Sequence, residues 1–134
     1  MTTQAETLAA SIAAIKRDIL ASPGILLDCK RQVGKTTAIL ELIHDEHQGR
    51  AAYVTFRSEL ADHAKHQYLK RWPQGELPFF TSDPEKLRGL LLPIYVDEWW
   101  MLFEQQRDRL IDFGGLVRAR VGTYPAVRRN YGSH

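Results

Sequence analysis

One stretch of the sequence carries residue types that could bind and transfer phosphate. Gly34-Lys35-Thr36-Thr37 follows a short apolar strand predicted at 25–28 and opens a segment typical of a helix. Phosphate oxygens need several backbone N–H donors at close range, and a loop that runs into a helix N-terminus supplies these donors with a favourable dipole. Lys35 would place a charge beside the β- and γ-phosphates, and the Thr36 hydroxyl would bind Mg²⁺. The pattern predicts a loop that binds ATP and Mg²⁺.

This loop departs from the phosphate-binding pattern G-x-x-x-x-G-K-[ST] at one position, because Cys29 stands where the first glycine is expected. Gly34 keeps the second glycine, which would let the backbone approach the phosphates without a Cβ. We expect Cys29 to be a small loop residue rather than a reactive thiol. A helix cap with a solvated lysine is the alternative interpretation of this stretch alone. The residues predicted to contact the nucleotide are Cys29, Lys30, Arg31, Gln32, Val33, Gly34, Lys35, Thr36 and Thr37.

A second stretch supplies two adjacent acids. The apolar run at 90–96 ends in Asp97-Glu98. A buried strand with acids at its carboxyl end suits an ATP site, because Asp97 would orient Mg²⁺ and Glu98 would activate the attacking water as general base. The alternative is a buried strand followed by an acidic helix N-terminus, which the helix dipole favours. The two stretches together favour a nucleotide site.

Size and composition limit the class of protein. The chain has 134 residues, enough for a single domain, and we place its core at 25–125. The net charge of +2 is too small to indicate a nucleic-acid partner by itself. The single cysteine excludes an internal disulfide and fits a reducing compartment. With no signal peptide and no long apolar run, we expect a cytoplasmic protein without a membrane partner.

The hydrophobic pattern alternates between helices and strands. It predicts helices at 4–21, 35–47, 59–71 and 99–112, a short helix from residue 84, strands at 25–28, 51–56, 91–97 and 116–122, and an extended piece at 79–81. Such alternation is typical of an α/β fold with a parallel sheet of four or five strands flanked by helices. Ligands bind beyond the carboxyl ends of parallel strands, so the loop, Asp97-Glu98 and Thr123 should share one site.

Other residues are open to more than one interpretation. Trp99 and Trp100 are adjacent and cannot share one helix face, so we expect one in the core, with the other free to lie at a partner surface. The helix at 59–71 has a basic side that is either solvated or in contact with nucleic acid. Arg118 and Arg120 share one face of the last strand, which implies either pairing or an edge position. The tail at 126–134 is expected to fray.

Three short motifs carry a family resemblance. Arg31-Gln32-Val33-Gly34-Lys35-Thr36-Thr37 resembles the Walker A loop of phage terminase large subunits, the ATPase motors that package DNA. In that family the loop commonly lacks the first glycine and carries Arg-Gln before Gly-Lys. Ile94-Tyr95-Val96-Asp97-Glu98 matches the Walker B pattern, and Thr123 matches the threonine or serine that ends the next strand. The loop is also similar to that of certain prokaryotic AAA-type ATPases.

The resemblance implies an ATPase with a P-loop NTPase core of the ASCE-like class, in which the last strand is central in the sheet. It implies that Lys35 and Glu98 act in catalysis, that Arg31 reaches the γ-phosphate and that Thr123 senses it. Such motors usually work as rings in which a neighbouring subunit's arginine completes the site, and they act on DNA. The candidates for that arginine are Arg118, Arg120, Arg128 and Arg129.

Two departures from the family leave a second interpretation open. The 134 residues hold no nuclease domain after the ATPase, so we expect no DNA cleavage, and they are few even for an ATPase half. The small size favours a nucleotide-binding module that regulates or scaffolds with little or no hydrolysis.

Overall fold

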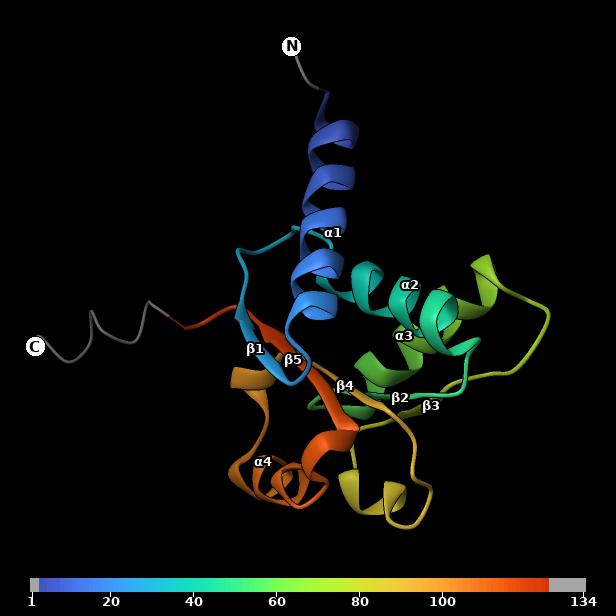
Figure 1. The fold of residues 1–134 in the computed structure, drawn as a ribbon, viewed down its shortest axis with the longest axis vertical. Coiled ribbons are helices and arrows are strands. Elements are labelled where there is room, and N and C mark those ends of the chain that lie inside the picture. Colours follow the sequence, from blue (N-terminus) through green and yellow to red (C-terminus); the bar gives the residue numbers. More distant parts are fainter. Residues whose placement is uncertain (1–2, 126–134) are drawn as a thin grey trace, which may run out of the picture.

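Five parallel strands form the centre of the molecule. The computed structural model describes residues 3–125, in which the strands follow the order β1-β5-β4-β2-β3 (Figure 1). The strands are β1 (Ile25–Asp28), β2 (Ala52–Val54), β3 (Phe79–Thr81), β4 (Ile94–Asp97) and β5 (Val117–Gly122). All neighbouring strands pair in parallel, which confirms the predicted α/β class with five strands. The tail at 126–134, predicted to fray, lies outside the described residues.

Helices cover both faces of this sheet (Figure 1). One face packs against α1 (Gln4–Ala21), α2 (Lys35–His47) and α3 (Ser58–Arg71). The other face packs against α4 (Glu104–Ile111) and short 3₁₀ helices, which span Pro84–Leu87, Trp99–Met101 and Gly114–Leu116. Within residues 3–125, none of the helices has the length and apolar character needed to cross a membrane.

The alternation of side chains along the central strands explains this two-sided core. Tyr53 and Tyr95 point to the α1–α3 face, whereas Val54 and Val96 point to the α4 face. All four are buried. Successive residues of a strand point to opposite faces, so a strand that is apolar throughout must be covered on both sides.

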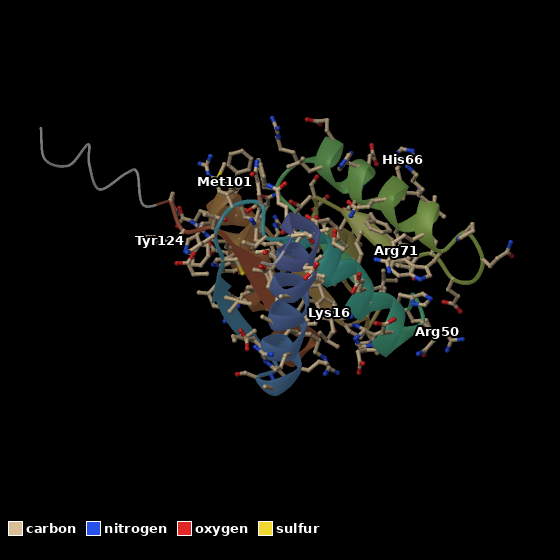
Figure 2. The ribbon with its side chains drawn as sticks, turned by 90° about the horizontal axis from the view of Figure 1, so that it is seen from above. Lys16, Arg50, His66, Arg71, Met101 and Tyr124 are labelled. Atoms are coloured by element: carbon tan, nitrogen blue, oxygen red, sulfur yellow. The ribbon has the colours of Figure 1, made fainter. Side chains whose placement is uncertain are left out.

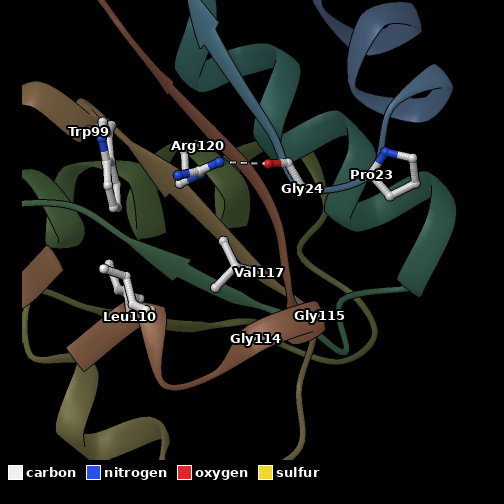
Figure 3. A pocket seen from close by; sticks show the side chains of 9 residues that line it. Pro23, Gly24, Trp99, Leu110, Gly114, Gly115, Val117 and Arg120 are labelled. Carbon is white, nitrogen blue, oxygen red and sulfur yellow. Dashed lines mark hydrogen bonds between the residues drawn. The ribbon is translucent and has the colours of Figure 1, made fainter. Parts of the chain in front are cut away.

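Strand β5 lies between β1 and β4, so its arginines are not on an edge strand. Arg120 donates a hydrogen bond to the Gly24 carbonyl oxygen at 3.0 Å, and its guanidinium lies 5.2 Å from the ring centroid of Trp99 (Figure 3). Arg118 is exposed. Of the two alternatives left open by the sequence, pairing holds for Arg120, because a carbonyl and an aromatic face compensate its burial.

Three predicted elements are shorter than expected. The strand predicted at 51–56 spans only Ala52–Val54. The strand predicted at 91–97 begins at Ile94, because Leu91 takes a positive φ of 53° and is 77% exposed. The helix predicted at 99–112 is wrong in its first turns: a 3₁₀ helix ends at Met101, and α4 begins only at Glu104. Phe103, directly before α4, is 67% exposed, and Ile111 at the end of α4 is 66% exposed. Trp99 is the core tryptophan, and Trp100 is half-buried.

A charged cluster joins the three helices of one face. Glu41 of α2 accepts hydrogen bonds from Lys16 of α1 at 2.9 Å and from Arg71 of α3 at 2.6 Å, one on each carboxylate oxygen. In Figure 2 both basic side chains lie beside α2. Burial by itself raises the pKa of the Glu41 carboxyl, but the hydrogen bonds from Arg71 and Lys16 outweigh burial and lower the pKa overall. The cluster therefore stabilises the fold only while Glu41 is ionised.

We predict that Glu41→Gln lowers the free energy of unfolding at neutral pH by about 1 kcal/mol, the upper range for ion pairs near a surface. Because the folded-state pKa of Glu41 is depressed, its contribution is present above the unfolded-state pKa and disappears as the pH falls through the folded-state pKa. Urea unfolding across the acid range should show wild type and variant converging. Glu46→Gln, on an exposed position of the same helix, is the control, and a difference that persists in strong acid would contradict the prediction.

Candidate functional site

The loop between β1 and α2 presents free backbone donors. The Cys29 N–H donates to the Gly122 carbonyl oxygen at 2.7 Å, which ties the start of the loop to β5. Within residues 3–125, no backbone N–H from residue 30 to residue 37 donates to another backbone oxygen at hydrogen-bonding geometry, although residues 31–32 form a turn. Gln32 and Gly34 take the left-handed conformation, with φ of 58° and 86°. A run of free N–H groups that ends at a helix N-terminus is the arrangement that binds anions.

The structure gives a packing reason for glycine at position 34. The sequence suggested instead that glycine lets the backbone approach the phosphates. A Cβ on Gly34 would lie 2.5 Å from Cγ1 of Ile12 and 3.3 Å from Cδ1 of Leu8, both on α1. The side of Gly34 that lacks a side chain therefore faces α1. Close packing on that helix and the positive φ both exclude a larger residue.

Lys35 meets two other predicted residues. The residue is only 8% exposed, and Nζ donates to Thr123 Oγ1 at 3.1 Å. The same Nζ lies 3.8 Å from Glu98 Oε2. The three residues come from α2, from the turn after β4 and from the end of β5, so the strand order brings them together.

Thr36 and Asp97 are also in direct contact, and a tyrosine joins them. Thr36 Oγ1 and Tyr53 Oη each donate to Asp97 Oδ2 at 2.5 Å. Asp97 is 2% exposed, and its Oδ1 has no hydrogen-bond partner within residues 3–125. Burial raises the pKa of Asp97, while the hydrogen bonds from Thr36 and Tyr53 and the charge of Lys35 oppose the rise. Tyr53 was missed by sequence analysis, which shows only a tyrosine in an apolar strand.

Glu98 occupies a strained turn. Its backbone is left-handed, with φ of 57° and ψ of 49°, an uncommon conformation for a residue with a side chain. Gly122 permits this turn, because a Cβ there would lie 2.9 Å from the Trp99 nitrogen and 3.3 Å from Glu98 Cα. Burial and the neighbouring Asp97 raise the pKa of Glu98, and Lys35 and Arg31 partly oppose the rise. A carboxylate with a raised pKa is suited to accept a proton near neutral pH.

Lys35, Glu98 and Thr123 border a cavity of about 660 Å³ beside the loop. Its lining includes Arg31, Gln32, Lys35, Glu98 and Thr123, and its apolar wall is formed by Phe56, Leu60, Met101, Tyr124 and Pro125. Figure 2 shows Met101 and Tyr124 at the same end of the molecule. Two smaller cavities have volumes of about 180 and 200 Å³, and Thr36 and Glu98 line both of them. The combined space is of the size that binds a small ligand.

The remaining predicted contact residues differ in their position. Cys29 and Val33 are half-buried and pack against the hydrophobic core, so their side chains face away from a ligand. Lys30 is exposed. Thr37 Oγ1 accepts a hydrogen bond from Gln67 Nε2 at 3.0 Å, a contact with α3 that sequence analysis missed. The site is therefore centred on Lys35, Thr36, Asp97, Glu98 and Thr123.

The oxygen atoms of Thr36 and Asp97 fit the predicted Mg²⁺. Within residues 3–125, no group of three or more His, Cys, Asp or Glu side chains could hold a metal ion. Mg²⁺ does not need such a cage, because it commonly takes one or two protein oxygens and completes its shell with water and substrate phosphates. The unpartnered Oδ1 of Asp97 leaves that carboxylate with spare capacity for a cation.

A further cavity lies apart from the residues of the candidate site. It has a volume of about 280 Å³ and lies between Trp99, Leu110, Val117 and the Gly114-Gly115 turn (Figure 3). None of the residues predicted to contact nucleotide or metal lines it.

Comparison of the chain with family models, curated proteins and solved structures found no match.

We predict that Gly122→Ala destabilises the protein by about 1–3 kcal/mol, the usual cost of overpacking a tight site. The added Cβ would displace the backbone of the turn that carries Glu98. Guanidinium unfolding measures the loss. Gly115→Ala is the matched control, because a Cβ at Gly115 meets no atom within 4 Å and its change should stay within about 0.5 kcal/mol. Equal stabilities of the two variants would show that the turn can accommodate a Cβ at Gly122, which would contradict the prediction.

Proposed function

We propose that this protein is a Mg²⁺-dependent P-loop ATPase with an ASCE-like core, of the kind that drives DNA packaging in phage terminases. One observation carries the proposal: Lys35, Thr36, Asp97, Glu98 and Thr123 come from three separated segments and form one contact network at the carboxyl edge of the sheet. This convergence in space supports the proposal beyond what the short sequence patterns do on their own. The central position of β5 agrees with the class.

Each residue has a role in the proposed reaction. The free N–H groups of the loop and Lys35 bind the β- and γ-phosphates. Thr36 and Asp97 hold Mg²⁺, which would neutralise charge on the phosphate oxygens. Glu98 takes a proton from water as the water oxygen bonds to the γ-phosphorus and the bond to the bridging oxygen of ADP breaks. Thr123, already bonded to Lys35, contacts the γ-phosphate, and Arg31 at the cavity edge offsets the developing charge.

The proposed partners follow from the same resemblance. Ring assembly requires an arginine from a neighbour, and Arg118 suits this role better than Arg120, because Arg118 is exposed and Arg120 already bonds to Gly24. Arg128 and Arg129 lie outside the described residues. A DNA partner would meet the exposed His63, His66 and Lys70 of α3.

We predict that Glu98→Gln retains ATP affinity and lowers phosphate release by about 10²-fold or more, the usual contribution of a general base. The amide keeps the shape of the side chain and cannot accept the proton. Calorimetry and phosphate-release assays on one preparation, with and without DNA, measure both quantities. Glu104→Gln, on an exposed glutamate at the start of α4, is the control. Unchanged release would remove Glu98 from the mechanism. Wild type that binds ATP and releases no phosphate would be a nucleotide-binding module.

We also predict an acid limb in the pH profile of turnover that lies above the ordinary pKa of glutamate. Glu98 must be ionised to accept a proton, and burial and the charge of Asp97 raise its pKa. Turnover therefore falls as the pH drops through this raised value. Arg31→Gln should move the limb to higher pH, because Arg31 lowers the pKa of Glu98. Arg50→Gln, on a surface arginine paired with Glu76, should leave the limb in place. A limb that Arg31→Gln does not shift would exclude Glu98 as the titrating group.

A further inference from the structure

We propose that Tyr53 is a positioning residue for the Mg²⁺ site: its hydroxyl holds the Asp97 carboxylate, and Asp97 in turn orients the Thr36 hydroxyl toward the metal. The inference rests on the proposed function and extends it to a residue on a strand, β2, that has no part in the loop or the acidic pair. It starts from the contact of Tyr53 Oη with Asp97 Oδ2 at 2.5 Å.

The two hydrogen bonds to Asp97 determine how its carboxylate is rotated. Tyr53 and Thr36 both donate to Oδ2, and neither donates to Oδ1. Two donors on one oxygen fix the plane of the carboxylate, since a rotation about the Cβ–Cγ bond would break both. Without the tyrosine hydroxyl, Thr36 would be the one remaining side-chain hydrogen-bond donor to this carboxylate within residues 3–125.

The orientation of Asp97 also orients Thr36. A hydroxyl has one proton and two lone pairs. When the proton of Thr36 Oγ1 is committed to Asp97 Oδ2, the lone pairs point elsewhere and are available to a cation. Outer groups that hydrogen-bond to metal ligands commonly set metal affinity in this way, and their removal typically costs 10–100-fold.

Tyr53 is itself rigidly held. It is 2% exposed and lies in the middle of β2, paired with Phe80 of β3 and Tyr95 of β4. Its ring packs at 5.5 Å from the ring of Phe80. A buried tyrosine between two paired strands has little freedom to move. Its hydroxyl therefore keeps one position and restricts the position of the carboxylate.

Tyr95 provides a closely matched control. It is the register partner of Tyr53 on the neighbouring strand, points to the same face and is 3% exposed. Its hydroxyl is hydrogen-bonded to His47 Nε2 at 2.8 Å, on α2. Tyr95→Phe therefore removes one buried tyrosine hydroxyl and one hydrogen bond, as Tyr53→Phe does, without touching Asp97.

The test measures ATP affinity by calorimetry as a function of free Mg²⁺ for wild type, Tyr53→Phe and Tyr95→Phe. We expect all three to bind ATP equally in EDTA, and the Mg²⁺ concentration that gives half of the metal-dependent gain to rise about tenfold in Tyr53→Phe alone. Equal Mg²⁺ requirements of the two phenylalanine variants would overturn the inference and leave the proposed function intact. A wild type that binds no ATP at any Mg²⁺ concentration would overturn both.

A second measurement separates positioning from a general loss of stability. If Tyr53 acts only through Asp97, then adding Tyr53→Phe to Asp97→Asn should raise the Mg²⁺ requirement no further than Asp97→Asn alone. Full additivity of the two changes would overturn the inference. The comparison of Asp97→Asn with the double variant can also be made if Tyr53→Phe alone proves unstable. Asp97→Asn removes the buried charge that makes the lost hydrogen bond costly.

Discussion

The burial of one carboxylate, that of Asp97, is the constraint on which the whole site depends. A carboxylate that is almost fully removed from water is costly unless hydrogen bonds or opposite charges compensate it. The hydroxyls of Thr36 and Tyr53 and the charge of Lys35 supply that compensation. The same contacts that make the buried acid tolerable therefore place the lysine and the threonine of the loop where a nucleotide would need them. The interactions that stabilise the buried carboxylate are therefore also the ones that the proposed function requires.

The order of the strands turns local patterns into a site. Because β5 lies between β1 and β4, its end meets the loop on one side and the acidic turn on the other. Gly122 contributes to both contacts: its carbonyl oxygen accepts the Cys29 N–H, and its missing side chain makes room for the turn at Glu98. Gly122, which has no side chain, thus contacts both the loop between β1 and α2 and the turn that carries Glu98.

The two adjacent acids have different environments, which suit the different roles proposed for them. Asp97 is enclosed by hydroxyl donors, whereas the Glu98 side chain is 34% exposed and borders the cavities beside the loop. When two neighbouring titratable groups lie in unlike surroundings, their pKa values differ. One group can then stay ionised as a metal ligand while the other exchanges protons. The left-handed backbone of Glu98 turns the chain between them, which sends the two consecutive side chains in separate directions.

The sequence by itself determined the features that depend on neighbours in the chain. The bounds of α1 and α2, the loop that ends in Gly34-Lys35-Thr36 and the acids at the end of β4 all match the predictions, because helix periodicity and apolar runs are local signals. Only the tertiary structure decided the rest: the irregular turns at 99–103, the exposure of Leu91, the role of Gly34 in packing on α1 and the contact of Tyr53 with Asp97. The last two depend on segments that are distant in the chain. Tyr53 and Asp97 are 44 positions apart, and only the pairing of β2 with β4 brings hydroxyl and carboxylate together.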